Sequence, residues 1–228
     1  MMNEEMRRKL IILGTGGNCM DILEAVREIN GSAAGGLYEC VGFLDDDAEK
    51  RGREYCGVKV LGPLDAAPQY ADCFFVNGIG SPANFWRKKD IIARTGLPPD
   101  RFEAVVHPSA SVSPTAQVGR GSVVLQNVAV ASNAVIGNHV IILPNSVIGH
   151  GDVIGDYTCI AGGACIAGGV AVGESCYLGA NSTIRGNTRI GDRCLVGMGS
   201  VVLGSVDANS VVVGNPARYL RRTVGEEA

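Results

Sequence analysis

Residues 134–157 read AVIGNHVIILPNSVIGHGDVIGDY, which is four blocks of six residues whose third member is always isoleucine. The same register runs without an insertion through residues 110–205, and the third residue of every block there is Val, Ile or Leu. A second period lies on top of the first, because every third block has a glycine directly after its aliphatic residue. These glycines recur every eighteen residues, at Gly119, Gly137, Gly155, Gly173 and Gly191.

This double period predicts a triangular prism of parallel β-strands. Each short side points one aliphatic residue inward, and three blocks of six residues complete one coil. Because hydrogen-bonded strands lie roughly 4.7–4.9 Å apart, residues eighteen positions apart are expected to lie above one another. The sequence alone therefore predicts which residues of the repeat are neighbours in space.

The composition of the whole chain limits its partners and its location. Its 228 residues are enough for two domains, and a formal charge of −3 gives no support for a nucleic-acid partner. Residues 1–9 are charged and no run of eighteen apolar residues exists, so we expect neither a signal peptide nor a membrane span. The eight cysteines contain no Cys-x-x-Cys pair, which favours reduced packing residues and a cytoplasmic protein.

The chain opens with the pattern of a nucleotide-binding α/β unit. Residues 9–13 (KLIIL) predict a strand, residues 14–18 (GTGGN) a glycine turn, and residues 19–29 a helix. Such a turn lets the backbone approach a phosphate, and the N-terminus of the helix attracts negative charge. Cys19 stands where a dinucleotide fingerprint has its third glycine, which disfavours NAD.

Further strands are expected at residues 40–44, 73–76 and 105–106, and a basic amphipathic helix at residues 85–94. The ends of parallel strands meet at one crevice, where such sheets bind ligands. We therefore predict a Rossmann-like domain over residues 1–108 that binds a nucleotide. The alternative for the acidic residues is a solvated turn, and the alternative for the domain is a truncated fold without a ligand. The predicted contacts are Gly14, Gly16, Gly17, Asn18, Asp45, Asp46 and Gly80.

The residues stacked beyond His150 at the eighteen-residue spacing are Gly168, Gly186 and Gly204, and this is the only one of the three equivalent columns that is bare of side chains. Such a strip is a groove with exposed backbone N–H groups that suits an extended thioester arm. The alternative is that the glycines only relieve backbone strain at the corner. We hypothesise that His150 is a general base and that the N–H of Gly168 stabilises an oxyanion. A surface histidine without a role is the alternative for His150.

The other two histidines receive different interpretations. His107 lies in the hinge between the two halves of the chain. His139 lies in the repeat, one corner away from His150, and we interpret it as a surface or interface residue. A metal role for His139 is disfavoured, and we expect no metal cofactor.

The chain resembles the hexapeptide-repeat acyltransferases, and most closely the nucleotide-amino-sugar N-acetyltransferases of the bacillosamine, perosamine and sialic-acid pathway type. The resemblance rests on residues 14–18, 43–46, 78–80, 107–110 and 214–218, besides the repeat itself. It implies that the β-helix of residues 109–205 is left-handed, that the first domain holds a nucleotide-linked amino sugar, and that acetyl-CoA is the cosubstrate. It also identifies His150 as the general base.

The same resemblance implies a homotrimer with its active sites between subunits. Apolar residues outside the inward row, such as Leu125, Leu143 and Val147, are expected on flat faces that trimer packing would bury. Residues 206–228 are expected to form a C-terminal strand with a short helix or tail. Arg218 in this segment is a predicted contact for the phosphates of coenzyme A, beside the glycine lane.

The chain departs from the pattern of that subfamily around His150. Gly151 stands where the subfamily has an Asp or Glu that orients the histidine, and Leu143 and Pro144 stand where it has an Asn-Thr-like pair. Asp152 is expected to point elsewhere because of strand alternation. Ser132 and Asp156 are therefore candidate substitutes for the missing carboxylate.

Several other functions stay open on the sequence. The nearest alternative is a sugar O-acyltransferase, or a transferase of another acyl group, on the same fold. A prism metalloenzyme of the carbonic anhydrase type is less favoured, because His139 and His150 are eleven residues apart and the type needs a His-x-x-x-x-His pair. A non-catalytic nucleotide-sugar binder is the third alternative.

Overall fold

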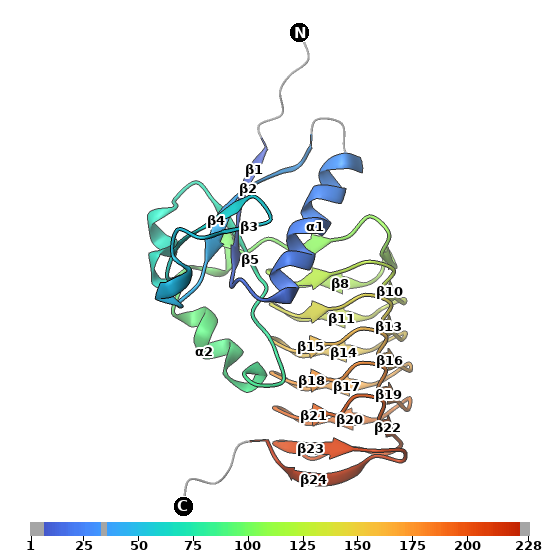
Figure 1. Cartoon of the computed structure of the whole chain (residues 1–228). Helices are drawn as coiled ribbons and strands as arrows, with labels where there is room; N and C mark the ends of the chain where they lie inside the picture. Colours follow the sequence, from blue (N-terminus) through green and yellow to red (C-terminus); the bar gives the residue numbers. More distant parts are fainter. Residues whose placement is uncertain (1–6, 33–35, 224–228) are drawn as a thin grey trace, which may run out of the picture.

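The computed structural model describes residues 7–32 and 36–223, which form an α/β domain packed against one side of a long β-helix (Figure 1). Residues 1–6, where most of the charged N-terminal stretch falls, and residues 224–228 of the tail lie outside the described residues. Within the described ranges, none of the helices combines the length and the apolar character that crossing a membrane requires.

The first domain is built on a five-stranded sheet with the strand order β3-β4-β2-β1-β5. β1 lies between β2 and β5 and is parallel to both, whereas β3 is antiparallel to β4. The buried residues of α1 recur at helical spacing and pack on this sheet. The bounds are β1 Arg8–Leu13, α1 Gly17–Ser32, β2 Tyr38–Leu44, β3 Glu54–Tyr55, β4 Val58–Gly62, β5 Phe74–Asn77 and α2 Lys88–Ala93.

Two features of this domain differ from the sequence-based expectation. The hairpin of β3 and β4 was not anticipated, although residues 58–61 (VKVL) are mostly apolar. The helix expected at residues 85–94 begins with a 3-10 turn, Phe85–Arg87, and only Lys88–Ala93 is α-helical. Further 3-10 turns lie at Ala48–Lys50, Leu64–Gln69 and Pro99–Arg101.

The β-helix has the predicted period. Its strands are two residues long, and each pairs in parallel with the strand eighteen residues later, as Val147 does with Cys165. The corners hold residues with positive φ, such as Asn145, Gly163 and Asn181, which tolerate this conformation better than most residues. The strands are β7 Ser111–Val112, β8 Gln117–Val118, β9 Val123–Val124, β10 Ala129–Val130, β11 Val135–Ile136, β12 Ile141–Ile142, β13 Val147–Ile148, β14 Val153–Ile154, β15 Cys159–Ile160, β16 Cys165–Ile166, β17 Ala171–Val172, β18 Tyr177–Leu178, β19 Thr183–Ile184, β20 Arg189–Ile190, β21 Leu195–Val196 and β22 Val201–Val202.

These strands stack into the three sides of the prism. One side runs from β7 to β22, the second from β8 to β20, and the third, which we call the covered sheet, runs from β6 to β24. The inward residues from Val124 to Val202 form one continuous buried core. The covered sheet is the side on which the first domain packs (Figure 1).

We had expected the strand β6, Val105–Val106, to be the last strand of the first domain. It belongs instead to the β-helix. It pairs with β9, because Val105 lies eighteen residues before Val123 and so continues the repeat by one coil. At the other end, β23 (Ser210–Val213) and β24 (Arg218–Arg222) form an antiparallel hairpin. The prediction of a short helix in the tail is therefore wrong for residues up to 223. The strand β24 pairs with the open edge of β23, and the charged side chains of β24 protect the edge that β24 then forms.

The contact between the two domains corrects the expectation for Leu125. This side chain is fully buried in the same apolar cluster as α1, and Leu143 packs against that cluster. Val147, on another side, is 42% exposed. The repeat alone does not tell which of its sides the first domain covers.

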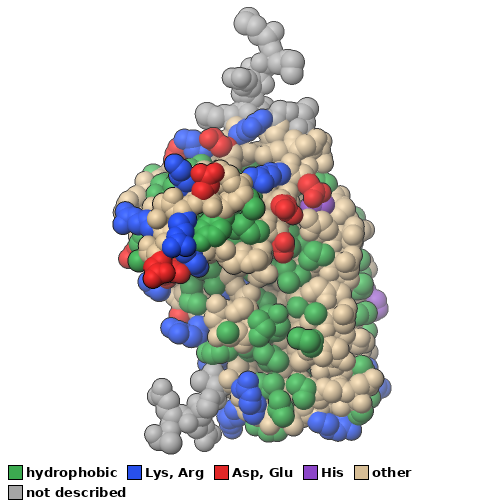
Figure 2. Space-filling model, in the orientation of Figure 1, with side chains coloured by type: hydrophobic (Ala, Val, Ile, Leu, Met, Phe, Trp, Pro, Cys, Tyr) green, Lys and Arg blue, Asp and Glu red, His purple; other side chains and the backbone are tan. Residues whose placement is uncertain are grey.

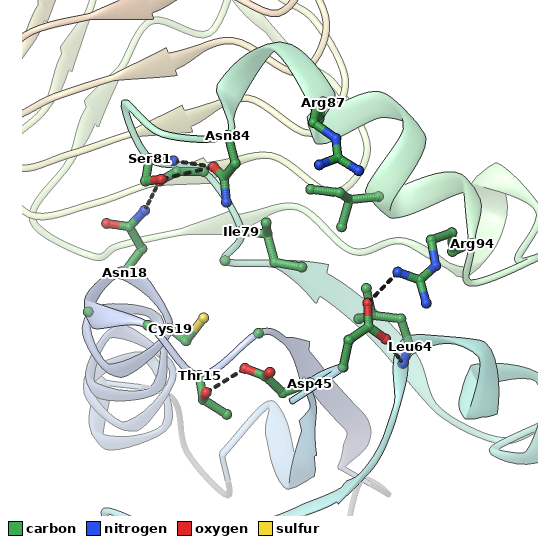
Figure 3. Close-up of a pocket in the computed structure, with 17 residues that line it drawn as sticks. Thr15, Asn18, Cys19, Asp45, Leu64, Ile79, Ser81, Asn84, Arg87 and Arg94 are labelled. Atoms are coloured by element: carbon green, nitrogen blue, oxygen red, sulfur yellow. Dashed lines mark hydrogen bonds and ion pairs between the residues drawn. The ribbon is translucent and has the colours of Figure 1, made fainter. Parts of the chain in front are cut away.

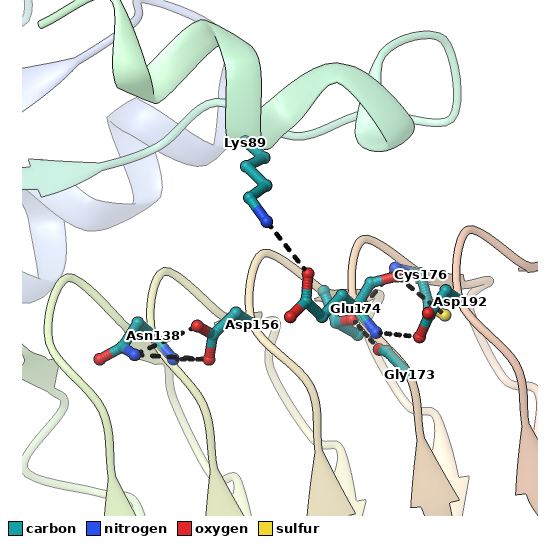
Figure 4. A network of polar contacts seen from close by, with 8 residues as sticks. Lys89, Asn138, Asp156, Gly173, Glu174, Cys176 and Asp192 are labelled. Atoms are coloured by element: carbon teal, nitrogen blue, oxygen red, sulfur yellow. Dashed lines mark hydrogen bonds and ion pairs between the residues drawn. The ribbon is translucent and has the colours of Figure 1, made fainter.

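Polar contacts add to the domain interface. Lys89 of α2 forms an ion pair of 3.5 Å with Glu174, at the corner where Asn138, Asp156, Glu174 and Asp192 stack in a column (Figure 4). Nε2 of His107 lies 2.8 Å from a carboxylate oxygen of Glu28 in α1. Lys88 is fully buried, and its Nζ lies 3.4 Å from Sγ of Cys159 in β15.

Candidate active site

A cavity of about 620 Å³ opens at the carboxyl ends of β1, β2 and β5, where the glycine turns and the acidic pair meet (Figure 3). This is the crevice at which open parallel sheets bind ligands. The structure brings together at this cavity all seven residues predicted as nucleotide-sugar contacts: Gly14, Gly16, Gly17, Asn18, Asp45, Asp46 and Gly80. Their role in binding stays a prediction.

The two carboxylates of the cavity are held by different partners. Asp45 accepts hydrogen bonds from Thr15 Oγ1, from the amide of Asp47 at 3.0 Å and from Lys50 Nζ at 3.2 Å. Burial raises the pKa of Asp45, but these hydrogen bonds outweigh burial and hold the pKa below its usual value. Asp45 is therefore an ionised acceptor at the end of β2, suited to a ribose or base N–H or O–H group.

Asp46 links the wall of the cavity to α2. It accepts the amide of Leu64 at 3.1 Å and forms an ion pair of 2.7 Å with Arg94 (Figure 3). On the opposite wall, Asn18 at the start of α1 donates to the carbonyl of Gly80 at 2.9 Å. The helix N-terminus is thereby fixed against the turn that follows β5.

Sequence reasoning missed several residues of this cavity. Arg87 points toward the cavity from the turn before α2, and its guanidinium has no partner among the described residues (Figure 3). It faces the same space as the N-terminus of α1, so two positive groups flank the cavity. Ser81 and Asn84, which bond each other at 3.0 Å, are further lining residues that were not predicted. The basic composition of residues 85–94 was the available signal for Arg87, but it does not tell which side chain turns inward.

His150 lies at the corner between β13 and β14, with its side chain exposed. A Cβ atom built on Gly168 would lie only 2.4 Å from Nε2 of His150, so the imidazole stands directly against the glycine one coil later. This is the neighbour relation predicted from the eighteen-residue period, and any larger residue at position 168 would displace the ring.

The glycine lane continues away from His150 along this corner. A Cβ atom on Gly186 would touch only the Gly168 carbonyl and Ala167, and one on Gly204 would meet nothing within 4 Å. The N–H groups of these three glycines donate to no acceptor within the described residues. At its far end, Gly204 lines a second cavity of about 310 Å³ together with Arg218 and Tyr219. The three glycines therefore lie along one corner, and Arg218 shares with Gly204 the cavity at the far end of that corner.

The candidate substitutes for the missing carboxylate lie in different places. Asp156 accepts the amide of Asn138 at 2.7 Å at the corner between β14 and β15, away from His150 (Figure 4). Ser132 receives the amide of Gly151 on its backbone carbonyl at 2.9 Å. Asp152 was expected to point elsewhere than His150, and it is fully buried beneath the turn that carries His150.

His139 was expected to be a surface or interface residue, and the structure places it at the interface between the two domains. It is 6% exposed and packs against the rings of Phe102, at 4.5 Å between centroids, and Tyr157, at 5.2 Å. Its Nδ1 atom is buried without a hydrogen-bond partner. Burial lowers the pKa of His139 to about 4, and the nearby charge of Lys88 acts in the same direction. The first domain covers this corner through Phe102, which the repeat pattern does not reveal.

The two candidate subsites lie on different sides of the molecule. The cavity of the first domain lies next to the covered sheet, since Gly80 at its wall contacts Cys159 of β15. His150, between β13 and β14, lies where the other two sides of the triangle meet, and that corner is opposite the covered sheet. One chain therefore does not join the cavity to His150. The described residues contain no group of three or more His, Cys, Asp or Glu side chains that could hold a metal ion.

Fold and site together define a two-domain protein in which a nucleotide-type α/β cavity accompanies a hexapeptide β-helix with a bare corner beside a histidine. Residues 9–91 match the family model described as the PglD N-terminal domain, and residues 169–204 match the bacterial transferase hexapeptide (six repeats). The resemblance and the fold class predicted from the sequence, including a left-handed parallel β-helix, are confirmed by these matches and by the solved structures below.

Solved structures with the same fold cover nearly the whole chain. The acetyltransferase domain of PglB from Neisseria gonorrhoeae FA1090 is 26% identical, with 94% of this chain and 100% of that chain covered and a TM-score of 0.80. PerB from Caulobacter crescentus, in complex with CoA and GDP-perosamine, is 26% identical, with 93% and 97% covered and a TM-score of 0.79. WeeI from Acinetobacter baumannii AYE is 27% identical, with 93% and 100% covered and a TM-score of 0.78. A search of curated proteins gives no match.

Proposed function

We propose that this protein transfers the acetyl group of acetyl-CoA to the amino group of a nucleotide-linked amino sugar. The similar PglB domain has been solved with acetyl coenzyme A, and the similar PerB with CoA and GDP-perosamine. The observation that carries the proposal here is the imidazole of His150 standing against Gly168 at the start of a lane free of side chains. An extended thioester fits such a lane, because its amide groups can bond the free backbone N–H groups.

The proposed reaction is a direct transfer. His150 removes a proton from the acceptor amine as the amine nitrogen attacks the thioester carbonyl. The free N–H of Gly168 stabilises the oxyanion. The attack forms the C–N bond, and collapse of the tetrahedral intermediate restores the carbonyl and breaks the C–S bond. The proton held by His150 then passes to the departing thiolate. The glycine lane of Gly168, Gly186 and Gly204 holds the pantetheine arm, and Arg218 meets the phosphates of coenzyme A.

The cavity of the first domain is proposed to hold the nucleotide part of the substrate. Asp45 and Asp46 are acceptors for the base or ribose at the end of β2. The N-terminus of α1 and the unpartnered guanidinium of Arg87 supply positive charge for the diphosphate.

We infer that the active site is completed by a second copy in a homotrimer. The cavity and His150 lie on different sides of one chain, so the sugar in one copy reaches the imidazole of a neighbour. The turn that carries His150 is flanked by Val147 and Val153, which are 42% and 49% exposed, and a neighbouring copy would cover them. Figure 2 also shows apolar side chains gathered over the coils below the first domain, whereas charged ones gather on that domain. We further infer a cytoplasmic location, supported by eight free cysteines.

An acceptor panel tests the proposal. The protein is mixed with acetyl-CoA and either nucleotide-linked 4-amino sugars or their hydroxyl counterparts, and free thiol and product mass are followed. The account predicts thiol release with at least one amino sugar and a product heavier by one acetyl group. Turnover with hydroxyl sugars alone would favour the O-acyltransferase, and nucleotide-sugar binding without any thiol release would favour a non-catalytic binder.

A further inference from the structure

The turn that carries His150 is closed from beneath by Asp152. The amide of Asp152 donates to the carbonyl of Gly149 at 3.3 Å, and Gly151 takes a φ of +68°, so His150 stands at the tip of a four-residue turn. The Asp152 side chain has no exposed surface. Oδ2 accepts the amide of Gly149 at 2.7 Å, and Oδ1 accepts the amide of Val170 in the next coil at 2.8 Å. One carboxylate oxygen thus holds Gly149, at the start of the turn, and the other holds the next coil, which contains Gly168.

Other corners of the β-helix make the inter-coil bond with a neutral hydroxyl. Ser122 accepts the amide of Val140 at 2.8 Å, and Thr158 accepts the amide of Cys176 at 3.0 Å, each eighteen residues later. Asp152 makes the equivalent bond to Val170 but adds a second acceptor and a negative charge. The stacking of coils therefore does not require a carboxylate at this corner.

The charge at this position also has a cost. Burial raises the pKa of Asp152 to about 6, while the two amide bonds and the charge of His150 act in the opposite direction. The pKa of such a carboxylate is higher in the folded state than in the unfolded chain. The protein therefore loses free energy of unfolding as the pH rises from the unfolded pKa through the folded pKa. A neutral serine or threonine would not carry this cost of burying a charge.

We propose that Asp152 is the positioning residue of His150, acting through the turn in place of the carboxylate absent at position 151. It fixes the turn so that the imidazole stands against Gly168, and it places a negative charge beneath the imidazolium that forms when His150 takes the amine proton. This inference rests on the proposed function, in which His150 is the base.

Two variants separate the parts of this role. Asp152→Asn keeps the size of the side chain and removes the charge, and Asp152→Thr copies the hydroxyl found at position 158. We expect kcat to fall roughly 10- to 100-fold in both, as for residues that orient a catalytic group, while KM values and nucleotide affinity change less than about twofold. Thr158→Val is the matched control: it removes the equivalent inter-coil acceptor at another corner, so it lowers the melting temperature but leaves kcat unchanged.

A double variant tests whether Asp152 acts through His150. In a His150→Ala background, Asp152→Thr is expected to leave the residual rate unchanged, whereas an independent structural effect would multiply the losses. Wild-type kcat in Asp152→Thr, or a loss of kcat matched by loss of nucleotide affinity, would overturn the inference. Full turnover in His150→Ala alone would instead overturn the proposed base, so the two failures are distinguishable.

Discussion

Gly168 determines where the imidazole of His150 can stand. A methyl group at this position would lie 2.4 Å from Nε2 and 2.6 Å from Cε1, closer than any non-bonded contact allows. Gly168→Ala should therefore push the ring away from the reacting carbon and lower kcat by about 100-fold, since misplacement by 1 Å costs that much. Steady-state kinetics with acetyl-CoA measures this effect.

The matched control for this substitution is Gly162→Ala. Gly162 occupies the equivalent position on another corner, where Ala180 follows eighteen residues later, and its Cβ would lie 3.3 Å from the Pro144 carbonyl. It should retain wild-type kcat. Equal losses in both variants would show that corner packing, and not the position of the imidazole, accounts for the effect.

Arg87 is the residue that discriminates between ligands with and without phosphates in the proposed binding mode. Arg87→Ala should weaken the affinity for a nucleoside diphosphate about tenfold, because a charge-assisted hydrogen bond is lost. The affinity for the matching nucleoside should not change. Calorimetric titration of both ligands measures the difference, and an equal loss for the two would place Arg87 outside the phosphate subsite.

At the scale of elements, the eighteen-residue period predicted contacts that the structure then displayed. It placed Gly168 beside His150 and paired every strand of the repeat, because stacking of coils leaves no freedom in register. The strand–turn–helix pattern likewise predicted β1, α1 and the cavity that they form with Asp45. These features depend on local periodicity, which sequence carries directly.

The remaining features depend on how two domains meet, which periodicity does not encode. His139 and Leu125 have positions in the repeat like those of exposed residues, yet the first domain covers both. The orientation of Arg87 follows from the 3-10 turn before α2, whose boundary the sequence did not predict. Asp152 was correctly expected to point away from the ring, but its two amide partners became visible only in three dimensions.

Lys88 of α2 makes the interface between domains sensitive to pH. It is fully buried against Cys159, and burial holds its pKa below the usual value of a lysine. The unfolded chain therefore binds the proton more readily, so stability should rise with pH up to about 10.5, the pKa of an exposed lysine.

Lys88→Met should remove this dependence and add about 1 kcal/mol of stability near neutral pH, since it replaces a buried polar amine by an apolar group. Urea unfolding of both proteins at pH 7 and pH 9.5 measures the difference. If the wild type gained no more stability than the variant over this range, the buried amine would have no part in the pH response.

At the scale of the whole molecule, the account requires two copies for one active site. The cavity adjoins the covered sheet, and His150 lies at the opposite corner of the triangle. A His150→Ala chain should therefore be complemented by a chain whose cavity is blocked. Gly16→Phe is suited to this, because nothing lies within 4 Å of the Cβ position on Gly16, which lines the cavity.

A trimer that contains both of these inactive chains should have about one third of wild-type activity, since one of its three sites then combines an open cavity with an intact histidine. The activity of differently tagged, co-expressed chains, purified through both tags, provides the measurement. Mixed oligomers without activity would show that each chain carries a complete site.

The most direct test of the central claim compares thiol release by the wild type and by His150→Ala with acetyl-CoA and a nucleotide-linked amino sugar, with nucleotide affinity measured on the same samples. The account predicts turnover by the wild type, a fall of at least about 1,000-fold in kcat for the variant, and unchanged nucleotide affinity. Turnover by His150→Ala at the wild-type rate would contradict it.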